Sequence, residues 1–120
     1  MSKFVDVYLL PIPEENVGAY RDLAAIASKF FLKHGARRYR EYVAADLNAP
    51  ELIPFPSVVE LLPGETLVYA AVEFDSKEQR DAANKLAFND PEMAAMMSCK
   101  PLFDYKRMVY GGFSILVDES

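Results

Sequence analysis

The chain has 120 residues, of which 52% are hydrophobic and 26% are charged. This composition excludes a disordered polar segment and predicts one compact domain over residues 1–120. The net charge of −5 repels phosphate at long range, so we expect no nucleic-acid partner. A single cysteine, Cys99, excludes an intramolecular disulfide and a cysteine-based zinc site. The sequence has no signal-peptide core and no apolar run of the roughly 20 residues that cross a membrane, so we expect a cytoplasmic protein without a membrane partner.

The first predicted elements are a strand and a long helix. Phe4–Leu10 is rich in β-branched and aromatic residues, and we expect Pro11 and Pro13 to end this strand because neither can donate to a sheet ladder. Between Glu14 and His34, apolar residues recur at spacings of three and four, which is typical of a helix with one buried face. Gly35 is expected to adopt the left-handed conformation that ends such a helix.

A second strand and a long connection follow. Residues 37–45 alternate with a period of two, and one face of this strand carries Tyr39, Glu41 and Val43. The segment 46–64 contains four prolines and is expected to be a connection with a short ordered piece. Whether residues 53–62 form a strand or a short helix stays open.

The second half of the chain repeats the alternation. Thr66–Phe74 is the clearest strand, and its continuous apolar character predicts coverage on both faces. Ser76 and Gln79 form a capping box that begins a helix with a predicted buried stripe of Ala83, Leu86 and Ala87. Asp90 with Pro91 predicts a further short helix. The last strand is expected from Lys106 to Val117, with a bulge or a close backbone approach at glycines 111 and 112.

This order of elements predicts an α+β fold. Two β-α-β halves with their helices on one face of a four-stranded antiparallel sheet make the ferredoxin-like, or split β-α-β, arrangement. The other face of the sheet would remain open to water, although both sets of alternating side chains on Phe4–Leu10 are apolar. We therefore expect a homodimer in which two sheets face each other.

Several segments resemble the uncharacterised YbaA-like family of small bacterial proteins. The most specific are Asn89-Asp90-Pro91 and Lys106-Arg107-Met108-Val109-Tyr110-Gly111-Gly112-Phe113, and the likeness extends through Tyr20-Arg21-Asp22 and residues 74–84. The resemblance implies a dimeric α+β barrel, in a superfamily that includes cofactor-free monooxygenases, lactone isomerases and haem-binding barrels. It implies no activity, because one fold supports many functions.

Single residues with chemical potential have simpler structural interpretations. His34 is the only histidine, and its place before Gly35 favours a role at the helix C-terminus over one as a catalytic base. Cys99 is interpreted as an apolar filler. Met93, Met96 and Met97 have the spacing of a buried helix face, which we favour over a soft-metal or haem site. We expect no metal or cofactor.

Acids inside the predicted strands are the candidate site. Acidic residues are depleted in strands because a half-buried carboxylate must find a partner. Even spacing within each strand allows these acids to share a face with tyrosines, which would suit an aromatic ligand. The acids are Asp6, Glu41 and Glu73, and the tyrosines are Tyr8, Tyr39 and Tyr69. The candidate catalytic residues are Glu41, Glu73, Tyr69 and Arg107.

A structural alternative is favoured for the same residues. The acids would pair with Arg38, Arg40 or Arg107 and set the strand register. We expect Glu41, Glu73 and Arg107 to form one half-buried network, with Asp6 at its margin.

Three classes of function therefore remain. The favoured class is a dimeric small-molecule-binding or interaction module. The alternative is a cofactor-free enzyme, monooxygenase-like or isomerase-like, that acts on a small aromatic or lactone substrate. The third is an RNA-associated protein, suggested by a basic cluster that we interpret instead as a solvated surface. The cluster comprises Lys29, Lys33, Arg37, Arg38 and Arg40.

Overall fold

The computed structural model describes residues 3–97 and 100–119, except for the side chains of Met96 and Met97. Four strands form one antiparallel sheet in the order β2-β3-β1-β4. The strands are β1 Phe4–Pro13, β2 Arg38–Val43, β3 Glu65–Phe74 and β4 Val109–Ser114. The helices are α1 Val17–Lys33, α2 Lys77–Phe88 and α3 Pro91–Met97, with 3₁₀ turns η1 Glu14–Asn16, η2 Phe55–Ser57 and η3 Tyr105–Arg107. The predicted ferredoxin-like fold is confirmed.

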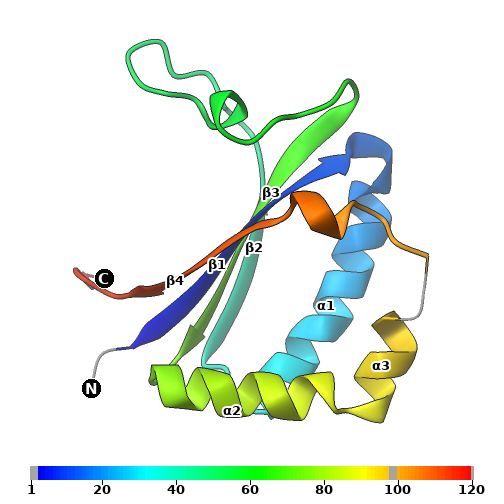
Figure 1. Cartoon of the computed structure of the whole chain (residues 1–120), viewed down its shortest axis with the longest axis vertical. Coiled ribbons are helices and arrows are strands. Elements are labelled where there is room, and N and C mark those ends of the chain that lie inside the picture. Colours follow the sequence, from blue (N-terminus) through cyan, green and yellow to red (C-terminus); the bar gives the residue numbers. More distant parts are fainter. Residues whose placement is uncertain (1–2, 98–99, 120) are drawn as a thin grey trace.

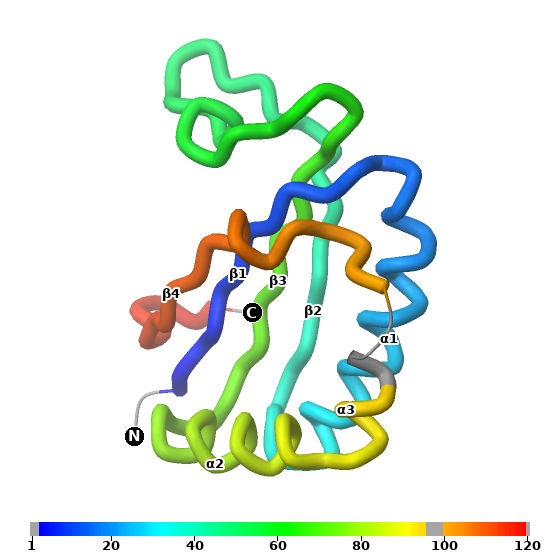
Figure 2. Tube along the Cα trace, turned by 45° about the vertical axis from the view of Figure 1, so that its right-hand side comes forward, coloured from blue at the N-terminus to red at the C-terminus, as the bar shows by residue number. Residues whose placement is uncertain are grey.

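All three helices lie on one side of the sheet (Figure 1). Helix α1 runs along this side of the sheet, α2 crosses the end of the sheet where β3 ends, and α3 lies beside α1 (Figure 2). No helix within the described ranges combines the length and hydropathy needed to span a membrane.

The two faces of the sheet differ in burial. Along β3, Val68, Ala70, Val72 and Phe74 are buried toward the helices, whereas Tyr69 between them is exposed. Cross-strand partners share a face, so this alternation assigns the side chains of the neighbouring strands as well. We call the side that faces the helices the inner face and the opposite side the outer face.

The first strand is longer than expected. β1 continues through Pro11 to Pro13, and both prolines pair in register with β3. The expectation that they end the strand was wrong, because β1 is an edge strand in this region. The pairing with β4 stops at Leu9, so no second neighbour requires an N–H from either proline.

The last strand is shorter than expected. β4 spans only Val109–Ser114, and residues 105–107 form the turn η3 instead of strand. Asp104 caps this turn by accepting a hydrogen bond from the Lys106 N–H at 3.0 Å. The predicted close approach is present, because a Cβ added at Gly112 would overlap the Phe4 ring.

The predicted helix boundaries are largely correct. The Ser76 hydroxyl accepts a hydrogen bond from the Gln79 N–H at 3.1 Å, which confirms the cap of α2. Ala83 and Ala87 are fully buried, but Leu86 is 54% exposed, so its assignment to the buried stripe was wrong.

The connection between β2 and β3 contains no strand. Among residues 53–62 the only regular structure is the 3₁₀ turn η2, so the open choice between a strand and a short helix is decided against the strand.

Gly35 supports a direct test of the packing between α1 and α2. Its φ of +122° is strained for any other residue, and an added Cβ would overlap the Gln79 carboxamide. We expect Gly35→Ala to lower the free energy of unfolding by about 1–3 kcal/mol in urea denaturation. The control is Gly18→Ala in α1, where a Cβ meets nothing within 4 Å and stability should be unchanged or higher. Equal stability of the two variants would contradict the account.

Candidate ligand-binding cavity

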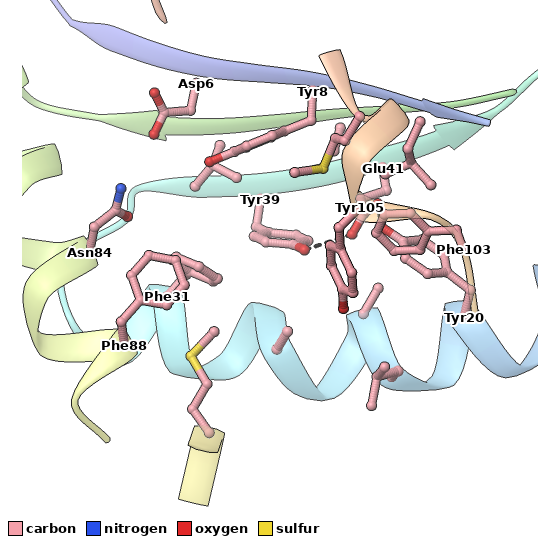
Figure 3. Close-up of a pocket in the computed structure, with 18 of the residues that line it drawn as sticks. Asp6, Tyr8, Tyr20, Phe31, Tyr39, Glu41, Asn84, Phe88, Phe103 and Tyr105 are labelled. Carbon is pink, nitrogen blue, oxygen red and sulfur yellow. Dashed lines mark hydrogen bonds between the residues drawn. The ribbon is translucent and has the colours of Figure 1, made fainter. Parts of the chain in front are cut away.

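A cavity of about 180 Å³ lies between the inner face of the sheet and the helices. Figure 3 shows the sheet on one side and α1 on the other, with Asn84, Phe31 and Phe88 toward one end and Tyr20, Phe103 and Tyr105 toward the other. Aliphatic and aromatic side chains form most of the remaining wall: Leu10, Leu23, Ala24, Ala27, Ala70, Val72, Phe74, Met93 and Met108. The cavity is therefore apolar, with polar groups at defined positions.

Small side chains create this space. Ala24 and Ala27 on α1 and Ala70 on β3 all line the cavity. No residue of α1 is fully buried, although the helix runs along the sheet. A close-packed helix-sheet interface would leave no such volume.

Glu41 is the polar centre of one end of the cavity. Its Oε1 accepts a hydrogen bond from the Tyr20 hydroxyl on α1, and its Oε2 accepts one from the Tyr39 hydroxyl at 2.6 Å. Burial, and secondarily the charge of Glu41, raises the pKa of both phenols well above the usual value. Tyr20 and Tyr39 therefore remain protonated donors at neutral pH, and the carboxylate links the helix to the sheet.

Asp6 is the polar centre of the opposite end. It is only 1% exposed, and its Oδ1 accepts hydrogen bonds from Arg80 Nη1 and from the Tyr110 hydroxyl, each at 2.6 Å. The Arg80 guanidinium also lies 4.6 Å from the centre of the Phe4 ring. The buried carboxylate is thus compensated by a cation that is itself mostly buried.

The segment 102–108 closes the cavity beside Glu41. The Asn16 side chain donates to the Leu102 carbonyl at 2.9 Å, and the ring centroids of Tyr20 and Phe103 lie 5.7 Å apart. These contacts attach the segment to the beginning of α1.

A second hollow adjoins the first on the side of β2. It has a volume of about 340 Å³ and lies between α1 and β2. Tyr20, Ala24, Tyr39 and Glu41 line both hollows. The hydrogen-bonded trio of Tyr20, Glu41 and Tyr39 therefore forms part of the wall between them.

The structure brings together four of the residues that the sequence analysis grouped by their spacing. Asp6, Tyr8, Tyr39 and Glu41 all line the cavity. The grouping was wrong for Glu73 and Tyr69, which lie on the outer face opposite Arg38 and Tyr42 of β2. In β3 the inner positions are the even-numbered residues, whereas Glu65, Tyr69 and Glu73 share the odd-numbered set on the outer face.

The predicted network of Glu41, Glu73 and Arg107 does not form. Nη1 and Nη2 of Arg107 each bond the Glu65 carboxylate at 2.8 Å, and Nη2 also bonds the Glu60 carbonyl. Arg107 lies in the turn η3 and not in a strand, so its side chain does not follow the sheet alternation. Glu65 and Glu73 are at opposite ends of β3, roughly 26 Å apart at about 3.3 Å per residue.

His34 joins two helices. It ends α1 as predicted, and its Nε2 lies 3.1 Å from Oδ2 of Asp90, the residue before α3. This hydrogen bond lowers the pKa of Asp90. It holds α3 near α1 and so helps to place the buried Met93 in the cavity wall. Cys99 and the side chains of Met96 and Met97 lie outside the described residues.

The basic cluster is partly neutralised. Arg37 pairs with Asp75 at 2.7 Å, and Lys33 lies 3.8 Å from Asp90. Arg38 and Arg40 lie on the outer face of β2. The cluster is thus divided between a helix end and one edge of the sheet.

Sequence reasoning missed three residues of the site. Tyr20 carried a signal, since it is a hydroxyl-bearing residue on an otherwise apolar helix face. Asn84 sits beside the buried Ala83 in α2, and its position was not considered. Arg80 gave no signal, because its long side chain reaches Asp6 across 74 positions of sequence.

The fold and the cavity define a class of protein, the ferredoxin-like α+β proteins with a hollow between sheet and helices. The chain belongs to the family described as "Protein of unknown function (DUF1428)", whose model matches residues 3–105. It is 38% identical over 117 residues to the "Uncharacterized protein YbaA" of Escherichia coli (strain K12), covering 98% of this chain and 99% of that protein. The YbaA-like resemblance is therefore confirmed.

Solved structures of low sequence identity share the fold. A dimeric ferredoxin-like protein from an uncultured marine organism matches with a TM-score of 0.57 at 8% identity, covering 99% of this chain and 100% of that one. SnoaB from Streptomyces nogalater, described as a cofactor-independent oxygenase, matches with a TM-score of 0.57 at 12% identity, covering 98% and 97%. At these identities the matches establish the fold alone.

The buried phenols predict an alkaline titration. Because the pKa values of Tyr8, Tyr20 and Tyr39 are raised in the folded protein, the stability they contribute is complete below the unfolded value of about 10. This contribution to stability is lost as pH rises from the unfolded pKa through the folded pKa values. Absorbance at 295 nm should show these three phenols ionising only together with unfolding, as monitored by circular dichroism. Ionisation of all seven tyrosines near pH 10 in a folded protein would contradict the buried cluster.

The pair of Arg107 and Glu65 predicts an acid dependence. The hydrogen bonds from Arg107 lower the pKa of Glu65, so the stability of the pair is complete above the unfolded value of about 4.3 and is lost as pH falls through the folded value. We expect Arg107→Ala to lower the melting temperature at pH 7, and the difference from wild type to shrink below pH 4. A difference that stays constant with pH would contradict the assignment.

Proposed function

We propose that the protein binds a small aromatic molecule in the cavity between sheet and helices. The observation that carries this proposal is a cavity of about 180 Å³ with an apolar wall and a few convergent polar groups. An apolar protein cavity of roughly 150 Å³ is large enough for benzene. The volume therefore suits a ligand with one ring.

A ligand screen tests binding directly. Any molecule that binds only the folded state raises the melting temperature by mass action. We expect single-ring aromatic compounds to raise it in a concentration-dependent way, and two-ring compounds to have a smaller effect.

A cavity-filling variant supplies the specificity test. Ala27→Phe should abolish the ligand-dependent shift, because the new ring occupies the space. The control is Ala19→Phe on the exposed side of α1, which lines neither hollow and should retain the shift. No shift in the wild type, or an equal shift in both variants, would overturn the proposal.

A second candidate is a cofactor-free reaction on the bound ring. It is supported by the acids and phenols of the cavity and by the likeness in fold to a protein described as a cofactor-independent oxygenase. A base must accept a proton from the substrate, but both oxygens of Glu41 already accept from tyrosines, and the Asp6 carboxylate is engaged in an ion pair with Arg80. Binding is therefore the function that the geometry supports better.

The two candidates differ in oxygen use. A hydroquinone oxidised by dioxygen loses two electrons and two protons, and yields a quinone and hydrogen peroxide. Oxygen uptake with hydroquinone above the rate without protein, lost in Ala27→Phe, would favour the enzyme. Binding of aromatic compounds without protein-dependent oxygen uptake would favour the binding function.

We also propose that the protein is a homodimer through the outer face of the sheet. Phe113 is 57% exposed there, and the exposed rings of Tyr42 and Tyr69 lie against each other with centroids 5.6 Å apart. Exposed apolar patches of this kind are typical of protein interfaces. A second copy of the chain would cover this face without requiring another protein, and a protein of similar fold is described as dimeric.

The connection between β2 and β3 extends this apolar surface. It projects away from the helices (Figure 1), and Leu52 and Ile53 on it are each 79% exposed. A partner sheet packed on the outer face would lie near this connection.

Light scattering tests the dimer. We expect a dimer mass at micromolar concentration for the wild type and a monomer mass for Phe113→Glu, which places a charge in the interface. Leu86→Glu on α2 is the control, because Leu86 has a similar exposure of 54% on the helix side and should leave the dimer intact. A monomeric wild type would contradict this proposal.

A further inference from the structure

Three polar groups meet at the end of the cavity near α2. Figure 3 shows the side chains of Asp6, Tyr8 and Asn84 there, with the Asn84 carboxamide directed toward Asp6. Among the described residues, the hydrogen bonds to Asp6 all go to Oδ1. Within the same ranges, the Tyr8 hydroxyl and the Asn84 carboxamide have no hydrogen-bond partner. One acceptor and two donor groups are thus available at one end of an apolar cavity.

The available groups have defined roles. Asp6 Oδ2 accepts, because Arg80 and Tyr110 hold the carboxylate from its other oxygen. The Tyr8 hydroxyl donates, because burial raises its pKa and keeps it protonated. The Asn84 amide can donate as well. Every buried side-chain nitrogen or oxygen of the described residues has a hydrogen-bond partner, so these groups keep free bonding capacity because the cavity reaches them. A ligand that bonds them there gains affinity and selectivity.

The charges at the Asp6 end of the cavity are unfavourable for ionic groups. No lysine, arginine or histidine is among the residues that line the cavity in the described part of the chain. Arg80, which is the basic partner of Asp6 among the described residues, compensates its charge from outside the cavity. An anionic group at this end would meet Asp6 with no cation in the wall to receive it. A cationic group would meet a carboxylate that Arg80 already pairs with, because the other carboxylate of the wall, Glu41, lies at the opposite end.

We propose that the cavity recognises a neutral single-ring aromatic molecule through a ring hydroxyl placed between Asp6, Tyr8 and Asn84. The ring lies against Phe31, Phe74 and Val72, which line the same cavity. The hydroxyl donates to Asp6 Oδ2 and accepts from Tyr8 or from Asn84. This inference rests on the proposed binding function and specifies the ligand class.

The test compares phenol with toluene, which has nearly the same shape but no hydroxyl. Titrations are followed by the ¹H–¹⁵N NMR signals of uniformly labelled protein, including the side-chain amide of Asn84. For the wild type we expect phenol to bind about tenfold more tightly than toluene, as one or two net hydrogen bonds would give. Benzoate should bind more weakly than either, and the Asn84 amide signal should shift with phenol but not with toluene.

Tyr8→Phe separates recognition from folding. Since the Tyr8 hydroxyl has no partner among the described residues, we expect this variant to keep its melting temperature, to bind phenol about fivefold more weakly and to bind toluene unchanged. Tyr69→Phe is the matched control, because this phenol lies on the outer face and should leave the preference intact. If Tyr8→Phe is destabilised, Asn84→Ala replaces it with the same expected loss.

The outcomes distinguish the two proposals. If neither phenol nor toluene binds, the proposed function fails. If both bind the wild type with equal affinity, or if Tyr8→Phe and Asn84→Ala keep the full preference, the cavity binds aromatic molecules but the hydroxyl site is overturned. Tighter binding of benzoate than of phenol would also overturn it.

Discussion

The carboxylate of Glu41 is the interaction on which the arrangement of the two layers depends. It lies on the inner face of an edge strand and bonds Tyr20 of α1 and Tyr39 of its own strand. A buried carboxylate without donors would be strongly unfavourable, so helix and sheet must keep the register that supplies them. With α1 held by this polar link, the alanines at positions 24, 27 and 70 leave a hollow that larger side chains would fill.

Charge compensation at the other end preserves the same hollow. Asp6 is buried on the inner face near the end of the sheet that α2 crosses, and Arg80 reaches it from α2. Replacing this pair by well-packed apolar residues would often cost no stability. A purely structural core would not require this pair, so its presence at the wall of a cavity supports a role in recognition.

The fold could be predicted from local sequence signals, whereas the pairing of charged side chains could not. The capping box at Ser76, the start signal Asp90-Pro91 and the strand alternation of residues 38–43 each depend on near neighbours in sequence, and each was predicted correctly. The partner of Arg107 is 42 positions away, and that of Asp6 is 74 positions away. Such pairs depend on the tertiary arrangement, which strand spacing alone does not specify. The face of β3 did carry a local signal that was not used, since Glu65, Tyr69 and Glu73 alternate with the apolar set that faces the helices.

A double-mutant cycle on Tyr20 and Glu41 tests the central claim most directly. The free energy of unfolding would be measured for the wild type, Tyr20→Phe, Glu41→Leu and the double variant. If the hydrogen bond joins helix to sheet, the two substitutions are coupled by about 1 kcal/mol or more. Additive effects, with a coupling energy within about 0.3 kcal/mol of zero, would show that α1 is held over the cavity by other contacts and would contradict the account.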